Sequence, residues 1–171
     1  MPEQIPYGRQ QISEVDIEAV VQVLRSDFLT QGPVVPEFER SVTAKCNAQF
    51  AIAVNSATSA LHIACMVLGV EPGDTVWTSP NTFVASANCA RYCGASVDFV
   101  DIDPLTWCMS VERLRQKLEY HQAAGLALPK VVIPVHLSGQ SCEMQAISEL
   151  GKKYGFRVIE DASHAIGGKY K

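Results

Sequence analysis

The sequence predicts an α/β protein whose largely parallel sheet is covered by helices on both faces. From about residue 50 onwards, short apolar runs alternate with stretches of helical periodicity, the order of a chain that crosses over between parallel strands. The apolar runs are hydrophobic throughout rather than at every second position, as in strands buried on both faces. We expect strands over residues 50–54, 75–78, 96–100, 131–135 and 156–159.

Caps and apolar spacing predict the helices. Ser13 to Asp16 has the pattern of a capping box, and apolar residues then follow at helical spacing as far as Phe28. A loop over residues 29–33 separates this helix from the next, because Gly32 and Pro33 break the pattern. The further helices are expected over residues 36–46, 58–68 and 83–92, from Ser110 to Leu118 and from Met144 to Leu150.

The composition is that of one ordinary globular domain. The chain has 171 residues, of which 47% are hydrophobic and 19% are charged. Its net charge of −4 and the lack of a Lys/Arg run argue against nucleic acid as a partner, because phosphate contacts need clustered basic side chains. Neither a secretory leader pattern nor an apolar run of about 20 residues occurs, so we expect a cytoplasmic protein that does not enter a membrane.

The six cysteines form no C-x-x-C pair and no zinc-ligand spacing with histidine. Most stand within apolar segments, and Cys89 and Cys93 are four positions apart on an expected helix. We interpret the cysteines as buried reduced thiols and expect no metal. A metal or redox role is the alternative.

Ligands gather at the carboxyl ends of parallel strands, so the residues that follow each strand are the candidates for binding. Small and hydroxyl residues from Asn55 to Leu61 follow the expected strand 50–54 and lead directly into a helix. Free N–H groups at such a helix start can bind an anion, although these residue types form a simple N-cap in most proteins. Neither G-x-G-x-x-G nor G-x-x-x-x-G-K-[ST] occurs, so the usual pattern for a dinucleotide or nucleoside-triphosphate site is absent.

Two other strand ends carry candidate residues. Phe83 follows strand 75–78 and would point into the crevice, although an aromatic residue at such a position often belongs to the core. Asp161 follows strand 156–159, where an acidic residue is costly unless it is paired. Either backbone N–H groups satisfy this carboxylate or it lies beside a cofactor cation. His164 is either a hydrogen-bonding partner or a surface histidine.

Five stretches, in order along essentially the whole chain, resemble the sugar aminotransferases of the DegT/DnrJ/EryC1/StrS family. Together they are far more specific than any one of them. The matching stretches are residues 29–33 (LTQGP), 38–39 (FE), 55–61 (NSATSAL), 79–88 (SPNTFVASAN) and 160–165 (EDASHA). The resemblance implies the large domain of a fold-type I transferase, which depends on pyridoxal 5′-phosphate (PLP).

The resemblance also implies roles for individual residues in holding PLP. Thr58 and Ser59 would hold the cofactor phosphate, with Ala57 next to it. Phe83 would stack on the pyridine ring, because an aromatic face fixes the orientation of the ring. Asp161 would pair with the ring nitrogen and His164 would lie near the phenolic oxygen.

For the substrate, the resemblance is strongest to the branch of the family that serves pseudaminic acid biosynthesis. Its members transfer an amino group from L-glutamate to C4 of a UDP-linked 4-keto-6-deoxy-N-acetylhexosamine, and family members are usually homodimers. The residues expected to line the sugar-nucleotide site are Tyr7, Asp27, Phe28, Leu29, Thr30 and Ala57.

The lysine that binds the cofactor covalently in this family is expected beyond Lys171, so we expect no catalytic residue within the chain. Lys169 and Lys171 come too soon after Asp161 and are interpreted as turn lysines. Residues 1–171 would then be the N-terminal segment and most of the PLP-binding domain, without the lysine segment and the C-terminal small domain. Such a truncated chain is not expected to turn over substrate.

Two alternatives to an aminotransferase stay open from the sequence. The first is a PLP-dependent sugar dehydratase of the same fold, in which histidine replaces the lysine. The second is a non-catalytic module that binds a nucleotide sugar or a partner chain. The set of Thr58, Ser59, Phe83, Asp161 and His164 argues against this second alternative, since a protein without PLP has little need of Asp161.

Overall fold

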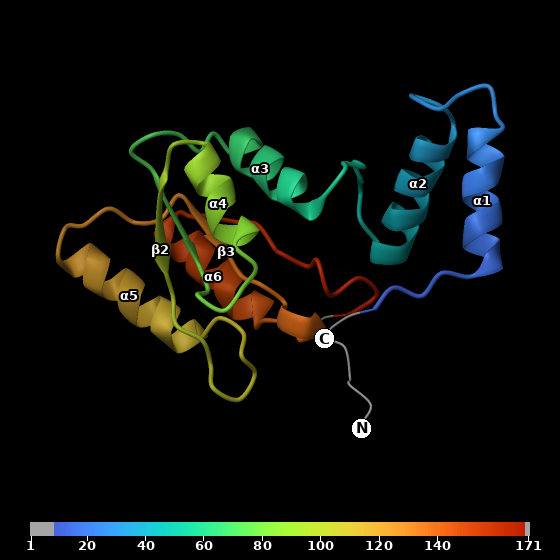
Figure 1. Cartoon of the computed structure of the whole chain (residues 1–171). Coiled ribbons are helices and arrows are strands. Elements are labelled where there is room, and N and C mark those ends of the chain that lie inside the picture. Colours follow the sequence, from blue (N-terminus) through green and yellow to red (C-terminus); the bar gives the residue numbers. More distant parts are fainter. Residues whose placement is uncertain (1–8, 170–171) are drawn as a thin grey trace, which may run out of the picture. The chain divides into compact units, whose positions relative to one another are not determined.

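The computed structural model describes residues 9–169 and divides into two compact units between Ala53 and Val54 (Figure 1). Within residues 9–169, the first unit carries two α-helices, and the second carries the sheet, four α-helices around it and a short 3-10 helix, η1 (Leu137–Gly139). Each unit is described by itself below.

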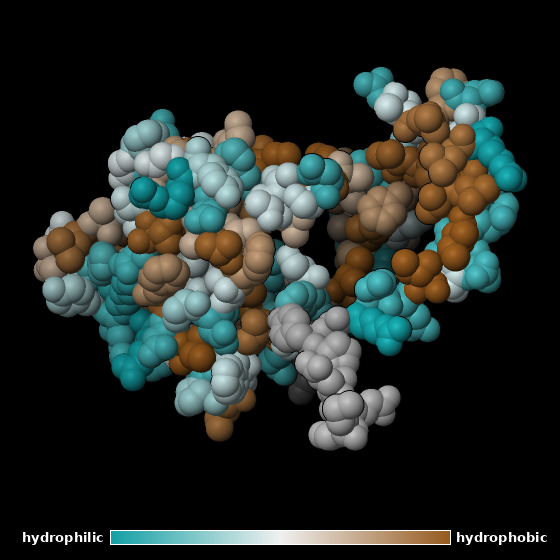
Figure 2. Space-filling model, viewed as in Figure 1, coloured by the Kyte–Doolittle hydropathy of each residue, from teal (hydrophilic) through white to brown (hydrophobic). Residues whose placement is uncertain are grey.

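The first unit consists of helices α1 (Glu14–Leu24) and α2 (Val34–Cys46). The capping box is confirmed, because Ser13 Oγ accepts from Asp16 N at 3.4 Å and Asp16 Oδ2 accepts from Ser13 N at 2.7 Å. None of the described residues of this unit is buried. The apolar side chains of its helices remain on the surface, where Figure 2 shows a hydrophobic face over α1 and α2.

The sheet of the second unit is parallel in all of its strand pairs, which agrees with the predicted largely parallel sheet. Strands β1 (Thr75–Thr78), β2 (Ser96–Phe99), β3 (Val131–Ile133) and β4 (Arg157–Val158) lie in the order β2-β1-β3-β4. The ladder of β3 ends two residues earlier than predicted, because Pro134 has no N–H to donate. Pairing resumes at a parallel bridge between Val135 and Asp161, which sets Asp161 at the carboxyl edge of the sheet.

The prediction of a strand over residues 50–54 is wrong. This segment pairs with no strand among the described residues, and its cross-segment hydrogen bond runs from Ala53 N to Glu39 Oε1 at 2.8 Å. Phe50 and Ile52 are 77% and 82% exposed. Apolar composition predicts burial, but a strand also needs a neighbouring strand that accepts and donates its backbone hydrogen bonds.

Helices cover both faces of the sheet, as predicted. Helices α3 (Ala57–Val67) and α4 (Ala85–Tyr92) share one hydrophobic cluster with Val76, Val131 and Ile133. Helices α5 (Val111–Ala123) and α6 (Met144–Tyr154) share the other cluster with Trp77 and Val132. Successive strand residues therefore enter opposite cores, which is why the strands are hydrophobic at every position.

Four of the six cysteines are buried and all six are free thiols, whereas Cys46 is exposed and departs from the expected burial. Among residues 9–169, no group of three or more metal-ligating side chains is arranged to hold an ion. None of the helices in that range is long and apolar enough to cross a membrane.

Candidate cofactor site

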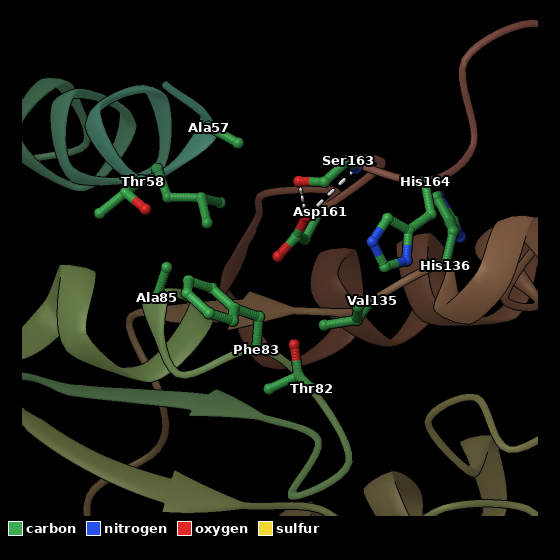
Figure 3. Close-up of a pocket in the computed structure, with 11 residues that line it drawn as sticks. Ala57, Thr58, Thr82, Phe83, Ala85, Val135, His136, Asp161, Ser163 and His164 are labelled. Carbon is green, nitrogen blue, oxygen red and sulfur yellow. Dashed lines mark hydrogen bonds between the residues drawn. The ribbon is translucent and has the colours of Figure 1, made fainter. Parts of the chain in front are cut away.

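A cleft with a volume of about 170 Å³ opens at the carboxyl ends of β1, β3 and β4 (Figure 3). All of its lining residues belong to the second unit. The sequence argument expected ligand-binding residues at this edge, and five of the six residues expected to hold the cofactor meet here. The lining residues are Ala57, Thr58, Leu61, Thr82, Phe83, Ala85, Val135, His136, Asp161, Ser163 and His164.

Asp161 is the buried charged group of this cleft, with 7% of its surface exposed. Its Oδ2 accepts from Ser86 Oγ at 2.6 Å, and its Oδ1 accepts from Ser163 Oγ at 2.6 Å and from Ser163 N at 3.3 Å. None of the described residues forms an ion pair with it. A buried carboxylate without a countercharge is costly, so the cleft fits a ligand that brings a cationic N–H to this position.

The amino end of α3 faces the cleft through Ala57 and Thr58. The N-cap Ser56 accepts from Ser59 N at 3.2 Å, and Ser59 Oγ donates to Asn55 Oδ1 at 2.7 Å. Ser59 is thus committed to the cap and is not part of the cleft lining. The amides of Ala57 and Thr58 and the Thr58 hydroxyl have no partner among the described residues, and they suit an anion such as a phosphate.

Phe83 lies in the loop between β1 and α4 and forms the lower wall of the cleft in Figure 3. Its side chain is 72% exposed although it is apolar. The prediction of a helix from residue 83 is off by two positions, since α4 begins at Ala85. Because Phe83 stays in the loop, its ring can stack on a planar ligand in the cleft.

Two histidines stand on the side of the cleft opposite α3. His136 is 6% exposed, and its Nδ1 accepts from Cys142 N at 3.0 Å. Its proton is therefore on Nε2, which donates to Glu160 Oε2 at 3.1 Å. His164 is exposed and lines the cleft next to it.

The thiol of Cys142 completes the surroundings of His136. Burial raises the pKa of Cys142 to about 12, with the neighbouring Cys108 as the next cause. The thiol is therefore protonated at neutral pH, and it donates to Val135 O at 3.2 Å. Together with the bond from Cys142 N, this fixes the chain immediately after β3.

Sequence reasoning missed Ser86, His136 and Ser163 as members of the site. His136 could have been found by the same rule that found Asp161, because it directly follows an expected strand. Ser163 lies within the matched stretch EDASHA and was passed over. Ser86 also lies within a matched stretch, SPNTFVASAN, but the sequence did not predict its contact with Asp161, which joins positions 75 residues apart.

Of the candidates for the sugar-nucleotide site, Ala57 lines this cleft, and the others in the described range belong to the first unit. Tyr7 lies outside the described residues. Asp27, Phe28, Leu29 and Thr30 form an exposed loop after α1 in the first unit. The hydroxyl of Ser26 shapes this loop by contacts with Val23 O at 2.8 Å and Phe28 O at 3.1 Å.

The geometry of the second unit defines a class of protein. One cleft at the edge of its parallel sheet is lined by a helix amino end with free N–H groups, an aromatic ring and a carboxylate without a cationic partner among the described residues. A phosphorylated pyridine cofactor requires these surroundings for its phosphate, its ring face and its ring nitrogen. The solved structures with the same fold belong to such a class of protein. The fold is that of the fold-type I PLP-dependent transferases.

The sequence model of the DegT/DnrJ/EryC1/StrS aminotransferase family matches residues 10–171, and the chain belongs to this family. Its members depend on PLP. The expectation of a PLP-dependent sugar aminotransferase family is therefore confirmed.

Two curated relatives show how much of a family member the chain represents. It is 40% identical over 167 residues to the spore coat polysaccharide biosynthesis protein SpsC of Bacillus subtilis, covering 98% of this chain and 41% of the relative. It is 39% identical over 167 residues to the UDP-4-amino-4-deoxy-L-arabinose–oxoglutarate aminotransferase of Shewanella sediminis, covering 98% and 41%. The chain thus spans about two fifths of the length of these relatives.

Solved structures give the same picture. A DegT/DnrJ/EryC1/StrS aminotransferase from Brucella abortus superposes with a TM-score of 0.84 at 32% identity, covering 88% of this chain and 40% of that one. Spr1654 of Streptococcus pneumoniae in its PLP form gives 0.83 at 31% identity, covering 96% and 44%. NtdA of Bacillus subtilis, with bound pyridoxamine phosphate (PMP), gives 0.79 at 31% identity, covering 90% and 34%.

Proposed function

We propose that the whole protein transfers an amino group from L-glutamate to C4 of a UDP-linked 4-keto-6-deoxy-N-acetylhexosamine. We also propose that this chain contributes residues that bind the cofactor non-covalently. One observation carries the proposal. Asp161 is a buried carboxylate at the sheet edge that accepts a hydrogen bond from a hydroxyl on each oxygen and has no cationic partner among residues 9–169.

Asp161 would accept a hydrogen bond from the protonated ring nitrogen of the cofactor. The bound cofactor supplies an electron-withdrawing ring that stabilises negative charge at the carbon losing its proton, and it carries the amino group between the two substrates. A carboxylate beside the ring nitrogen favours its protonated form, because the two opposite charges stabilise each other in a site shielded from water. The Asp161 side chain would thus control the ring's capacity to withdraw electrons.

The amino end of α3 would hold the cofactor phosphate. Ala57 N, Thr58 N and the Thr58 hydroxyl would donate to it, and the helix dipole favours negative charge at this end. Ser59 would act indirectly, because its hydroxyl is bonded to Asn55 and keeps the first turn in shape.

Phe83 and His164 would fix the orientation of the ring. Phe83 would stack on one face of the pyridine, and His164 would lie near the phenolic oxygen. The neighbouring His136 is bonded through both ring nitrogens, so it supports the shape of the cleft.

The sugar nucleotide would contact Tyr7, Asp27, Phe28, Leu29, Thr30 and Ala57, and the whole protein would be a homodimer. The name of the Shewanella sediminis relative, which includes a UDP-amino sugar and oxoglutarate, supports the UDP group and the glutamate donor. The choice of a 6-deoxy-N-acetylhexosamine rests on the resemblance of the sequence to the pseudaminic-acid branch.

The lysine that binds PLP covalently would come from outside residues 9–169. None of the residues that line the cleft is a lysine, and Lys169 is exposed. We therefore expect the 171-residue chain, treated with PLP and borohydride, to keep its unmodified mass. A trapped adduct mapped to Lys169 would contradict this assignment.

Equilibrium binding of PMP tests the cofactor site, because PMP needs no covalent bond to lysine. We expect PMP to bind the chain and pyridoxamine, which lacks the phosphate, to bind roughly 100-fold more weakly, because it loses the charge-assisted hydrogen bonds at the amino end of α3. Asp161→Asn is expected to weaken PMP binding at least tenfold. Asp101→Asn, at a different strand end and outside the cleft, is the matched control. Equal binding of PMP by both variants would contradict the proposal.

The substrate is tested with the whole protein by following 2-oxoglutarate release from L-glutamate. We expect release with the UDP-linked 4-keto-6-deoxy-N-acetylhexosamine and slower release with the corresponding 4-keto-arabinose nucleotide. The reverse preference would retain the aminotransferase and overturn the proposed sugar. Loss of water from the sugar without use of glutamate would point to the dehydratase reaction instead.

A further inference from the structure

We propose that Ser86, supported by Thr82, is the positioning residue that aims the Asp161 carboxylate at the ring nitrogen of the cofactor. This inference rests on the proposed role of the cleft. It concerns a side chain on α4 that is fully buried and lies outside the cleft lining.

The direction of the hydrogen bonds follows from counting protons. Ser86 Oγ lies 2.6 Å from Asp161 Oδ2 and 2.7 Å from Thr82 Oγ1. A carboxylate can only accept, so the single proton of Ser86 goes to Asp161 and Thr82 must donate to Ser86. The three side chains form a chain in one direction, Thr82 to Ser86 to Asp161, in which each bond strengthens the next.

A purely local role for the Ser86 hydroxyl fits the distances less well. In a helix, a serine hydroxyl commonly bonds a carbonyl of the preceding turn, and Phe83 O lies 3.3 Å from Ser86 Oγ. The bond to Asp161 is 0.7 Å shorter and is assisted by charge. The Ser86 hydroxyl therefore donates its hydrogen bond to the Asp161 carboxylate and not to Phe83 O.

The two oxygens of Asp161 are held in different ways. Oδ1 accepts from Ser163, two residues further along the same turn, so this contact moves together with Asp161. Oδ2 accepts from Ser86, which belongs to a helix on one face of the sheet. The bond from Ser86 is thus the one that fixes the rotation of the carboxylate relative to the cleft.

This arrangement leaves Oδ2 free to accept one further hydrogen bond from the cleft. A carboxylate oxygen has two lone pairs in its plane, and Ser86 occupies one of them. With the carboxylate plane fixed, the remaining lone pair keeps one direction, as a ring N–H requires. Without Ser86, the carboxylate could rotate and would be oriented only when the cofactor binds.

The test compares PMP with its analogue 1-deaza-PMP, in which a carbon replaces the ring nitrogen, as ligands of the 171-residue chain. For Ser86→Ala we expect about tenfold weaker PMP binding and unchanged binding of 1-deaza-PMP. Ser86→Thr, which keeps the hydroxyl, should restore the preference for PMP. In an Asp161→Asn background, Ser86→Ala should have no further effect on PMP.

The outcomes separate the inference from the proposed function. If the unsubstituted chain bound neither ligand, or bound both equally well, both proposals would be overturned. If it preferred PMP and Ser86→Ala kept that preference in full, only the role of Ser86 would be overturned. An equal loss of both ligands would show that Ser86 merely supports the fold.

A second variant avoids any packing change in the buried core. Thr82 lines the cleft and is half-buried, so Thr82→Val removes the outer donor while nearly keeping the side-chain volume. We expect it to lower the preference for PMP in the same direction as Ser86→Ala and by a smaller factor. An unchanged preference in Thr82→Val would remove Thr82 from the proposal.

Discussion

The two units of the chain use the same helical pattern of apolar residues with opposite results. Leu24 on α1 is 64% exposed, whereas Leu118 on α5 is completely buried. The sheet-bearing unit has two hydrophobic clusters, and the α1–α2 unit has no buried residue in its described part. Apolar periodicity therefore predicts that a helix forms and which face is apolar, but not what covers that face.

The largest expected difference comes from removing the same side chain in each unit. Leu118→Ala should lower the free energy of unfolding by about 2–5 kcal/mol, because it leaves a cavity in the core. Leu24→Ala should change it by less than about 0.5 kcal/mol, because the leucine is already largely in water. Urea denaturation followed by circular dichroism measures both values.

The same two leucine variants can also contradict the contrast between an exposed and a buried helix face. A loss in Leu24→Ala as large as that in Leu118→Ala would mean that the α1 face is covered in solution. The slope of the free energy with urea concentration should be unchanged in both variants, so that each shift of the midpoint reports stability alone.

Helix caps offer a smaller contrast between the units. Ser110 Oγ accepts from Arg113 N at 3.3 Å at the start of α5, and Ser13 closes the capping box of α1. Each Ser→Ala change should cost about 1 kcal/mol of helix stability. We expect Ser110→Ala to lower the unfolding midpoint of the sheet-bearing unit. Ser13→Ala should instead speed amide hydrogen exchange in α1 and leave that midpoint unchanged.

The smallest expected effect concerns acid. Lys130 Nζ lies 2.7 Å from Asp74 Oδ2, and this hydrogen bond holds the pKa of Asp74 below its usual value near 3.8. A lowered pKa in the folded state adds stability above the pKa of the unfolded chain, and that stability is lost as the pH falls through the folded value. Lys130→Met should therefore cost about 0.5–1 kcal/mol at pH 7, with the deficit shrinking below about pH 4.

Asp16 is the matching carboxylate in the α1–α2 unit. Hydrogen bonds from the backbone and then the side chain of Ser13 lower its pKa as well. Acid should loosen α1 by protonating Asp16 without changing the unfolding of the sheet-bearing unit. A deficit in Lys130→Met that stayed constant down to pH 2 would contradict the assignment of the Asp74 ion pair.

The sequence predicted the parallel sheet and both of its helical layers because these depend on local order and continuous hydrophobicity. Asp161, Phe83 and Thr58 could be predicted to lie at the carboxyl edge of the sheet, because each lies in a segment that follows an expected strand, and all three line the cleft. The error at residues 50–54 shows the limit, because strand pairing depends on a partner that composition does not specify.

Ser86 could not be predicted in the same way. Its hydroxyl meets Asp161 only because α4 packs against the sheet next to the end of β4. The early end of β3 could have been predicted from the sequence, because Pro134 has no backbone N–H to donate to the strand ladder. The tautomer of His136 depends on the path of the chain to Cys142, which periodicity does not describe.

The central claim is that Asp161 meets the ring nitrogen of a bound cofactor. The most direct measurement is the ¹⁵N chemical shift of ring-labelled PMP bound to the chain, followed from pH 6 to pH 9 in the unsubstituted protein and in Asp161→Asn. The account predicts a nitrogen that stays protonated throughout this range in the unsubstituted protein and loses its proton within it in Asp161→Asn. A nitrogen that titrates identically in both proteins would contradict the account.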